Sequence, residues 1–294
     1  MTDTAETAQV DDRVEPTFMR PPSACGTEFE QVDWVGTLAV HLEDQTYVGI
    51  RFNDQRLMDA VGERLGDRVT EPAGEVPAYY SVKLNAPTRR RKAPMHYVYL
   101  GARPVVGTRD VSRLVGGLAA HVGQHLEPTT DIYTSHGIPV RTPAGVLLVP
   151  SDLLLMSKVV DRVLRPAGYV TADVPFVHLD LDAAEVVVPE SALSLELDAA
   201  TIEALPASEA DEALAPGSYP IARWLVPVGA EEAGPLRHAQ AVLHVTRSLK
   251  TPFPHGAQAA VNDVARVAKD VPVLGVTWAS DEELVQAVLE AGRG

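Results

Sequence analysis

The segment from Ser135 to Lys158 constrains the fold more than any other part of the sequence. Its apolar run GVLLV is typical of a buried strand, and the short loop PSD separates that strand from the helical pattern LLLMSKVVDRVL. Pro166 and Gly168 close the helix. A strand that passes directly into a helix is the building unit of α/β proteins, and the loop between them is a common place for phosphate groups. Here, however, no glycine lies between Gly145 and Gly168.

The rest of the chain repeats this alternation of strand and helix patterns. Strand patterns occur in VGTLAVHLED, TYVGIRFN, AYYSVKLN, HYVYLG, YVTAD, FVHLDLDAAEVVVPE, YPIARWLVPVG and VPVLGVTW. Helical patterns occur in DQRLMDAVGERLGD, TRDVSRLVGGLAAHVGQHL, RHAQAVLHVTRSL, HGAQAAVNDVARVAK and ASDEELVQAVLEAG, the last with a capping box of Ser280 and Glu283. The patterns predict an α/β fold, with a mixed sheet flanked by helices.

Composition excludes several classes of protein. The 294 residues include 25 basic and 40 acidic ones, and the resulting net charge of −15 argues against general binding of nucleic acid. No apolar run approaches the roughly 20 residues of a membrane span. The single cysteine, Cys25, excludes an internal disulfide and a metal site built mainly from cysteines. A cytoplasmic protein is therefore expected.

Composition also suggests the domain boundaries. Residues 1–30 are acidic, contain proline and lack an apolar period, so we expect a disordered leader without the features of a secretion signal. Residues 31–294 are predicted to form a single α/β domain. Within it, the Ala- and acid-rich stretch 191–218 is expected to be a variable surface insertion.

The order of these segments and their residue motifs resemble those of the C-terminal catalytic domain of HPr kinase/phosphorylase, which has the phosphoenolpyruvate-carboxykinase-type fold. The likeness extends over about residues 35–290, and it is motif-specific between His136 and Pro189. The residues that carry it are Ser135-His136-Gly137, Gly145-Val146-Leu147-Leu148, Ala172-Asp173 and the hairpin that ends at Pro189. The resemblance implies a fold that binds a nucleotide in its kinase members.

The phosphate-binding loop departs from the pattern of that family. Family members carry G-x-S-G-x-G-K-S, in which glycine amides approach the phosphates and the lysine and hydroxyl hold the terminal phosphate and Mg²⁺. Here the loop reads PSDLLLMSK, so a proline removes an amide donor and Asp152 adds negative charge. The sequence predicts a degenerate loop in which Ser151, Ser157 and Lys158 are vestigial, and no cofactor is expected. In the simpler account, Ser151 or Asp152 caps a helix whose leucines are core.

Two further residues match positions of the family. His136 precedes the nucleotide strand, and Asp173 ends a later strand, where ligands of α/β folds gather. The resemblance makes both of them catalytic candidates. The alternatives are a histidine held by ordinary hydrogen bonds at a strand edge and an aspartate that caps a turn before Val174.

Other titratable residues recur at spacings that metal sites use. His178, Asp180 and Asp182 alternate along one strand and so share a face, which is either a metal site or a solvated hairpin face. His121 and His125 are four residues apart on a helix, as zinc ligands are, but Gly123 weakens that turn. A polar helix end is the better interpretation of this pair. No metal site is predicted, and no G-x-S-x-G nucleophile motif occurs.

One dense basic cluster stands out on this acidic chain. Arg89, Arg90, Arg91 and Lys92 lie in APTRRRKAP, between two strand patterns that predict a hairpin. The cluster is either a solvated loop or a docking site for an acidic peptide or protein, whose encounter the charges would speed. The flanking strands could also accept a peptide by strand addition.

Two functions are compatible with these observations. The first is a non-catalytic binding or scaffolding protein, a pseudoenzyme acting on a peptide or protein client in a bacterial biosynthetic or regulatory pathway. The alternative is a divergent phosphotransferase using ATP and Mg²⁺, in which Lys158, Ser157, His136 and Asp173 share phosphate contact, metal contact and proton transfer. The degenerate loop favours the first. If the family assignment fails, the sequence predicts only a soluble α/β protein. Oligomers are compatible with either function.

Overall fold

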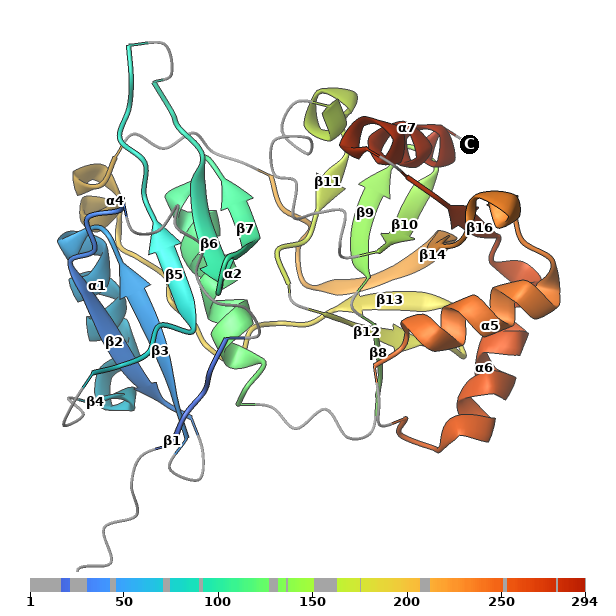
Figure 1. Ribbon diagram of the computed structural model, residues 1–294, viewed down its shortest axis with the longest axis horizontal. Coiled ribbons are helices and arrows are strands. Elements are labelled where there is room, and N and C mark those ends of the chain that lie inside the picture. Colours follow the sequence, from blue (N-terminus) through green and yellow to red (C-terminus); the bar gives the residue numbers. More distant parts are fainter. Residues whose placement is uncertain are drawn as a thin grey trace, which may run out of the picture.

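A computed structural model describes residues 17–21, 31–42, 46–70, 75–89, 92–126, 132–135, 137–150, 163–174, 176–206, 212–250, 253–278 and 280–293. Within these ranges the chain forms two mixed sheets, each with helices packed against it (Figure 1). The predicted α/β class is confirmed. Among the helices of the described ranges, none is long and apolar enough to cross a membrane.

The first sheet has seven strands in the order β4-β2-β3-β5-β6-β7, with β1 paired to β3. Its strands are β1 (Thr17–Phe18), β2 (Gly36–His41), β3 (Thr46–Phe52), β4 (Val69–Thr70), β5 (Tyr80–Lys83), β6 (His96–Leu100) and β7 (Arg103–Thr108). β3 is parallel to both β1 and β5, and the other pairs are antiparallel. We call this sheet and its helices the first lobe.

Two capped helices pack on the first sheet. α1 (Gln55–Leu65) begins at Asp54, whose side chain accepts hydrogen bonds from the amides of its first turn, and ends at Gly66 with a φ of 53°. α2 (Val111–Gly123) begins at Asp110 in the same way. A short 3-10 helix (Gly66–Arg68) follows α1. The apolar stripes of α1 and α2 join the strands in one buried core.

The second sheet has nine strands, with the order β11-β9-β10-β14-β13-β12-β8 and with β16 and β15 beyond β14. Its strands are β8 (Tyr133–Ser135), β9 (Ile138–Thr142), β10 (Gly145–Val149), β11 (Val170–Thr171), β12 (Val177–Asp180), β13 (Glu185–Val188), β14 (Gly217–Pro227), β15 (Gly234–Pro235) and β16 (Val273–Val276). We call this sheet and its helices the second lobe.

Helices lie on both faces of the second sheet. They are α5 (His238–Ser248), α6 (Ala257–Asp270) and α7 (Asp281–Gly292), with 3-10 turns at Arg165–Ala167 and Ala230–Glu232. Successive side chains of β10 point to opposite faces, so Leu147 packs with α7, whereas Leu148 packs with α5 and α6. The result is a three-layer arrangement with β14 at its centre.

The segment after β13 returns to the first lobe before the second sheet is complete. Leu195 and Leu205 are buried in the first core, and α4 (Ala199–Ala204) packs against α1. The chain then returns to the second lobe, where Leu214 is buried, and continues into β14. The stretch 191–218, expected to be a surface insertion, therefore passes across both lobes in its described part.

Candidate functional site

Arg89 and Lys92, the described residues of the basic cluster, lie on a long connection between β5 and β6. We call this connection, residues 84–95, the arm. In Figure 1 its two described sides run beyond the ends of β5 and β6. Arg89 and Lys92 are exposed on it, while Arg90 and Arg91 lie outside the described residues. The arm thus presents positive charge away from the body of the first lobe.

Two asparagines fix the base of the arm. Asn53 donates to the Leu84 carbonyl oxygen at 2.9 Å and accepts from the Leu84 amide at 2.8 Å. Asn85 donates to the Met95 carbonyl oxygen at 2.6 Å, and its own amide donates to Nδ1 of the buried His96 at 3.2 Å. Both sides of the arm are therefore tied to each other and to β3 where they leave the sheet.

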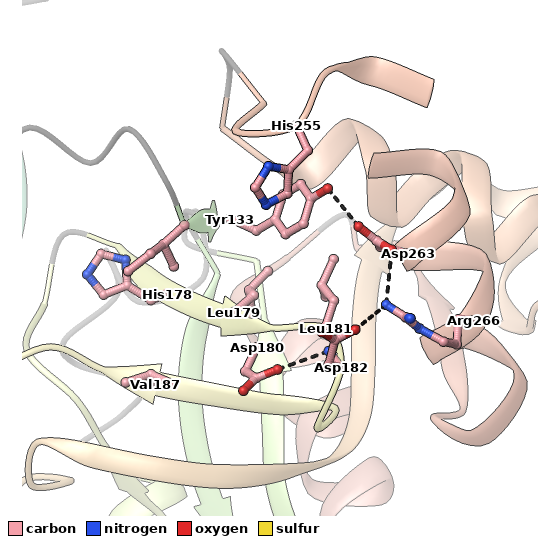
Figure 2. A pocket seen from close by; sticks show the side chains of 11 residues that line it. Tyr133, His178, Leu179, Asp180, Leu181, Asp182, Val187, His255, Asp263 and Arg266 are labelled. Carbon is pink, nitrogen blue, oxygen red and sulfur yellow. Dashed lines mark hydrogen bonds and ion pairs between the residues drawn. The ribbon is translucent and has the colours of Figure 1, made fainter. Parts of the chain in front are cut away.

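A cavity of about 590 Å³ lies in the second lobe, between the β12–β13 hairpin and α6 (Figure 2). β8 contributes Tyr133, and the loop before α6 contributes His255, whose ring meets that of Tyr133 edge to face at 6.0 Å between centroids. The lining residues are Ile132, Tyr133, His178, Leu179, Asp180, Leu181, Asp182, Val187, His255, Asp263 and Arg266.

A chain of polar contacts crosses this cavity wall. The Tyr133 hydroxyl donates to Asp263 Oδ2 at 2.8 Å, and Arg266 Nη2 lies 3.0 Å from Asp263 Oδ1. The same guanidinium nitrogen lies 2.5 Å from Asp182 Oδ1, as the dashed lines in Figure 2 trace. Burial, together with the hydrogen bond to the negative Asp263, raises the pKa of Tyr133 to about 12. Its phenol is therefore neutral at physiological pH.

Of the three residues predicted to share one strand face, His178 and Asp180 lie on β12, whereas Asp182 lies in the turn that follows it. Asp180 Oδ1 accepts hydrogen bonds from the amides of Asp182 and Ala183, both at 2.9 Å, and this closes the hairpin turn. His178, Asp180 and Asp182 all line the cavity. Within the ranges that the structure describes, no group of three or more His, Cys, Asp or Glu side chains is placed to hold a metal ion.

The cavity lining is suited to noncovalent contacts. It offers carboxylates, a guanidinium, a phenol and two imidazoles, but its described lining includes no serine, threonine, cysteine or lysine. Asp263 accepts from two partners and Arg266 bridges two carboxylates, so both are already engaged in ionic contacts. Such a surface can hold a polar ligand through ionic contacts and hydrogen bonds.

Replacing Tyr133 with phenylalanine is expected to lower the free energy of unfolding by about 1 kcal/mol, because Asp263 loses one hydrogen bond and the ring packing stays. Urea denaturation followed by fluorescence measures the change. Tyr219→Phe is the matched control, since that hydroxyl donates to the Ala215 carbonyl oxygen in an exposed position. A Tyr133→Phe protein no less stable than this control would contradict the expectation.

Asp173 is held in an ion pair between the two lobes. Its two carboxylate oxygens accept from the guanidinium of Arg113, through Nε on one side and through Nη2 at 2.9 Å on the other. The same guanidinium donates to Thr171 Oγ1 at 3.2 Å and to the Glu212 carbonyl oxygen at 3.1 Å. The Arg113 and Asp173 side chains are only 8% and 16% exposed. This ion pair therefore joins α2 of the first lobe to the β11 edge of the second sheet.

The remaining candidates fall into two groups. His136, Ser151, Ser157 and Lys158 lie outside the described residues. His121 and His125, at the end of α2, lie beside the buried Tyr80: the Tyr80 hydroxyl donates to the His121 carbonyl oxygen at 2.8 Å and lies 3.1 Å from His125 Nε2. The interpretation of this pair as a polar helix end is compatible with these contacts.

Sequence patterns did not single out Arg113, Asp263 or Arg266. Asp263 and Arg266 carry a local signal, since residues three apart on a helix share a face. Arg113 carries none, because its partner is 60 residues away in the chain. Comparisons with protein-family models, with curated proteins and with solved structures found no match to this chain.

Proposed function

We propose that this chain is a non-catalytic relative of HPr kinase/phosphorylase, with the fold of its C-terminal domain, that binds a peptide or protein client. The observation that carries the proposal is the arm. Arg89 and Lys92 stand exposed on a connection whose base is fixed by Asn53 and Asn85, on a protein whose net charge is −15. A basic projection with a fixed base attracts an acidic client. The acidic remainder of the protein surface repels the same client, so that encounter is favoured at the arm.

Two further observations support binding over catalysis. Asp173, which the family resemblance makes a catalytic candidate, is engaged by Arg113 through both oxygens. The cavity beside Tyr133 presents carboxylates, a guanidinium and a phenol that can hold a polar group of a client. Both observations fit a protein that retains an α/β framework and uses its surface to hold a client.

The test is binding of a fluorescein-labelled peptide of 12 residues rich in Asp and Glu, measured by anisotropy. Replacing the four basic residues of the arm with alanine is expected to weaken binding at least tenfold, and added salt is expected to weaken binding to the natural protein. The matched control also removes four positive charges, by replacing the exposed Arg64, Arg68, Arg247 and Lys269 on helices away from the arm, and leaves affinity within about twofold.

Equal affinity of the arm variant and the control variant would overturn the proposed function. The competing phosphotransferase is tested on the same protein by thermal unfolding with and without Mg-ATP. A ligand at about one hundred times its Kd stabilises by about 2.7 kcal/mol, which raises the unfolding temperature by several degrees. Such a rise, abolished by Lys158→Ala, would replace the binding function with a catalytic one.

A further inference from the structure

The strand register of the first sheet defines a face turned away from its helices. Because side chains alternate along a strand, residues paired across strands share a face. Ile50 and Tyr80 are register partners in the core under α1 and α2, so their neighbours Arg51 and Ser81, also partners, point the other way. We call this the outer face. The positions on it are Thr37, Ala39, His41, Tyr47, Gly49, Arg51, Ser81, Lys83, Tyr97 and Tyr99. Ala39, Gly49 and Ser81 are buried, and Val76 and Pro77 pack over Gly49, so the accessible part beside the arm is formed by Lys83, Tyr97 and Tyr99, which are half-buried.

Side-chain contacts agree with this assignment. Arg51 Nη2 donates to Ser81 Oγ at 3.1 Å, across the β3–β5 pair. The Arg51 guanidinium carbon also lies 4.0 Å from the ring centroid of Trp34, a cation–π contact. On β6, the rings of Tyr97 and Tyr99 have centroids 5.6 Å apart. Aromatic rings and cations thus lie together on neighbouring strands.

The charge of the outer face is opposite to that of the protein. The chain has 40 acidic and 25 basic residues, yet the positions of the outer face named above include no carboxylate. Its fully charged side chains are Arg51 and Lys83, which are half-buried. Lys83 is the last residue of β5, directly before the arm. Its register partner Tyr97 lies near the start of β6, directly after the arm. The basic surface of the arm therefore continues onto the sheet.

We propose that Lys83, Tyr97 and Tyr99 of the outer face, together with Arg89 and Lys92 of the arm, bind one acidic segment of a client that also carries a large apolar side chain. This inference rests on the proposed function and specifies its ligand. The carboxylates of the segment pair with Lys83, Arg89 and Lys92. Its apolar side chain packs on the rings of Tyr97 and Tyr99. Tyrosine rings supply broad contact area at little entropic cost, which suits them to such a role. Charge complementarity selects this occupant on an otherwise acidic protein.

The experiment compares two labelled peptides of equal length and charge, one containing only Asp, Glu, Gly and Ser, and one with a central leucine. On the natural protein, the leucine is expected to raise affinity about tenfold. Tyr97→Ala together with Tyr99→Ala is expected to remove that gain and leave the acid-only peptide bound. Lys83→Gln, a milder change, is expected to weaken both peptides about threefold. Phe253→Ala, at a half-buried ring of the second lobe, is the matched control and leaves the gain intact.

The outcomes separate this inference from the proposed function. If the arm variant weakens binding but the leucine adds nothing, or if its gain survives in the Tyr97 and Tyr99 variant, the outer face is not the docking surface and the function stands. If neither acidic peptide binds the natural protein, both proposals fail. Tighter binding of a single-stranded oligonucleotide than of either peptide would also overturn the inference. Loss of the gain in the tyrosine variant, with retained far-UV circular dichroism, supports it.

Discussion

Replacing Asp173 with alanine is expected to lower the free energy of unfolding by about 3 to 5 kcal/mol. The change leaves the Arg113 guanidinium with no carboxylate in a place where its side chain is only 8% exposed. An uncompensated buried charge is costly because the surroundings cannot replace the water it has lost. Since Arg113 belongs to the first lobe and Asp173 to the second, the loss also loosens the contact between lobes.

Urea denaturation measures this effect, and Asp182→Ala is the control. Asp182 also pairs with an arginine, Arg266, but its side chain is 82% exposed, so its loss is expected to cost less than about 1 kcal/mol. Replacing Asp173 and Arg113 together with leucine and methionine is expected to recover most of the lost stability, because no charge remains buried. Equal effects of Asp173→Ala and Asp182→Ala would show that the interlobe pair is not a buried one.

Acidification from pH 6.5 to pH 5 is expected to destabilise the protein by about 2 kcal/mol through His121, and by a smaller amount through His125. Burial lowers the pKa of His121 to about 3, with a further contribution from His125. Burial also lowers the pKa of His125 to about 4, helped by Lys250 of the second lobe. Below pH 6.5 the two imidazoles bind protons in the unfolded chain but stay neutral in the folded chain. Stability is therefore complete above pH 6.5 and decreases as the pH falls toward the folded pKa.

The measurement is the free energy of unfolding from urea denaturation at intervals between pH 7.5 and pH 5. The slope attributable to one such histidine is about 1.4 kcal/mol per pH unit. His121→Leu removes its share of the slope and leaves the contact between Tyr80 and the residue 121 carbonyl oxygen, which is backbone. A His121→Leu protein with the same pH profile as the natural one would contradict the buried, neutral state of that imidazole.

Local chemistry accounts for the parts of the fold that could be predicted. Asp54 caps the N-terminus of α1 and Gly66 ends the helix, and both effects depend only on residues within one helical turn. β7 was missed, since Pro104 interrupts its short pattern and its identity as a strand comes from pairing with β6. The division into two sheets was also missed, because it depends on which strands pair over long separations.

The same contrast applies to the candidate site. Alternation along one strand was enough to place His178 and Asp180 on one face of β12, whereas Asp182 lines the cavity from the following turn. Arg266, the ion-pair partner of Asp182, belongs to α6. No pattern within either segment predicts this ion pair. The basic cluster was visible in the sequence, but the two hydrogen bonds by which Asn53 holds the arm join residues 31 positions apart.

The return of residues 191–206 to the first lobe has a consequence for the order in which the two lobes can fold. During synthesis, the first sheet and α2 are complete by residue 123, yet Leu195 and Leu205 reach the first core only after much of the second lobe has been translated. During synthesis, the apolar surface of the first lobe that Leu195 and Leu205 cover is therefore exposed until those residues have been translated. A fragment that ends between the lobes would lack Leu195 and Leu205, and its first core would stay incomplete.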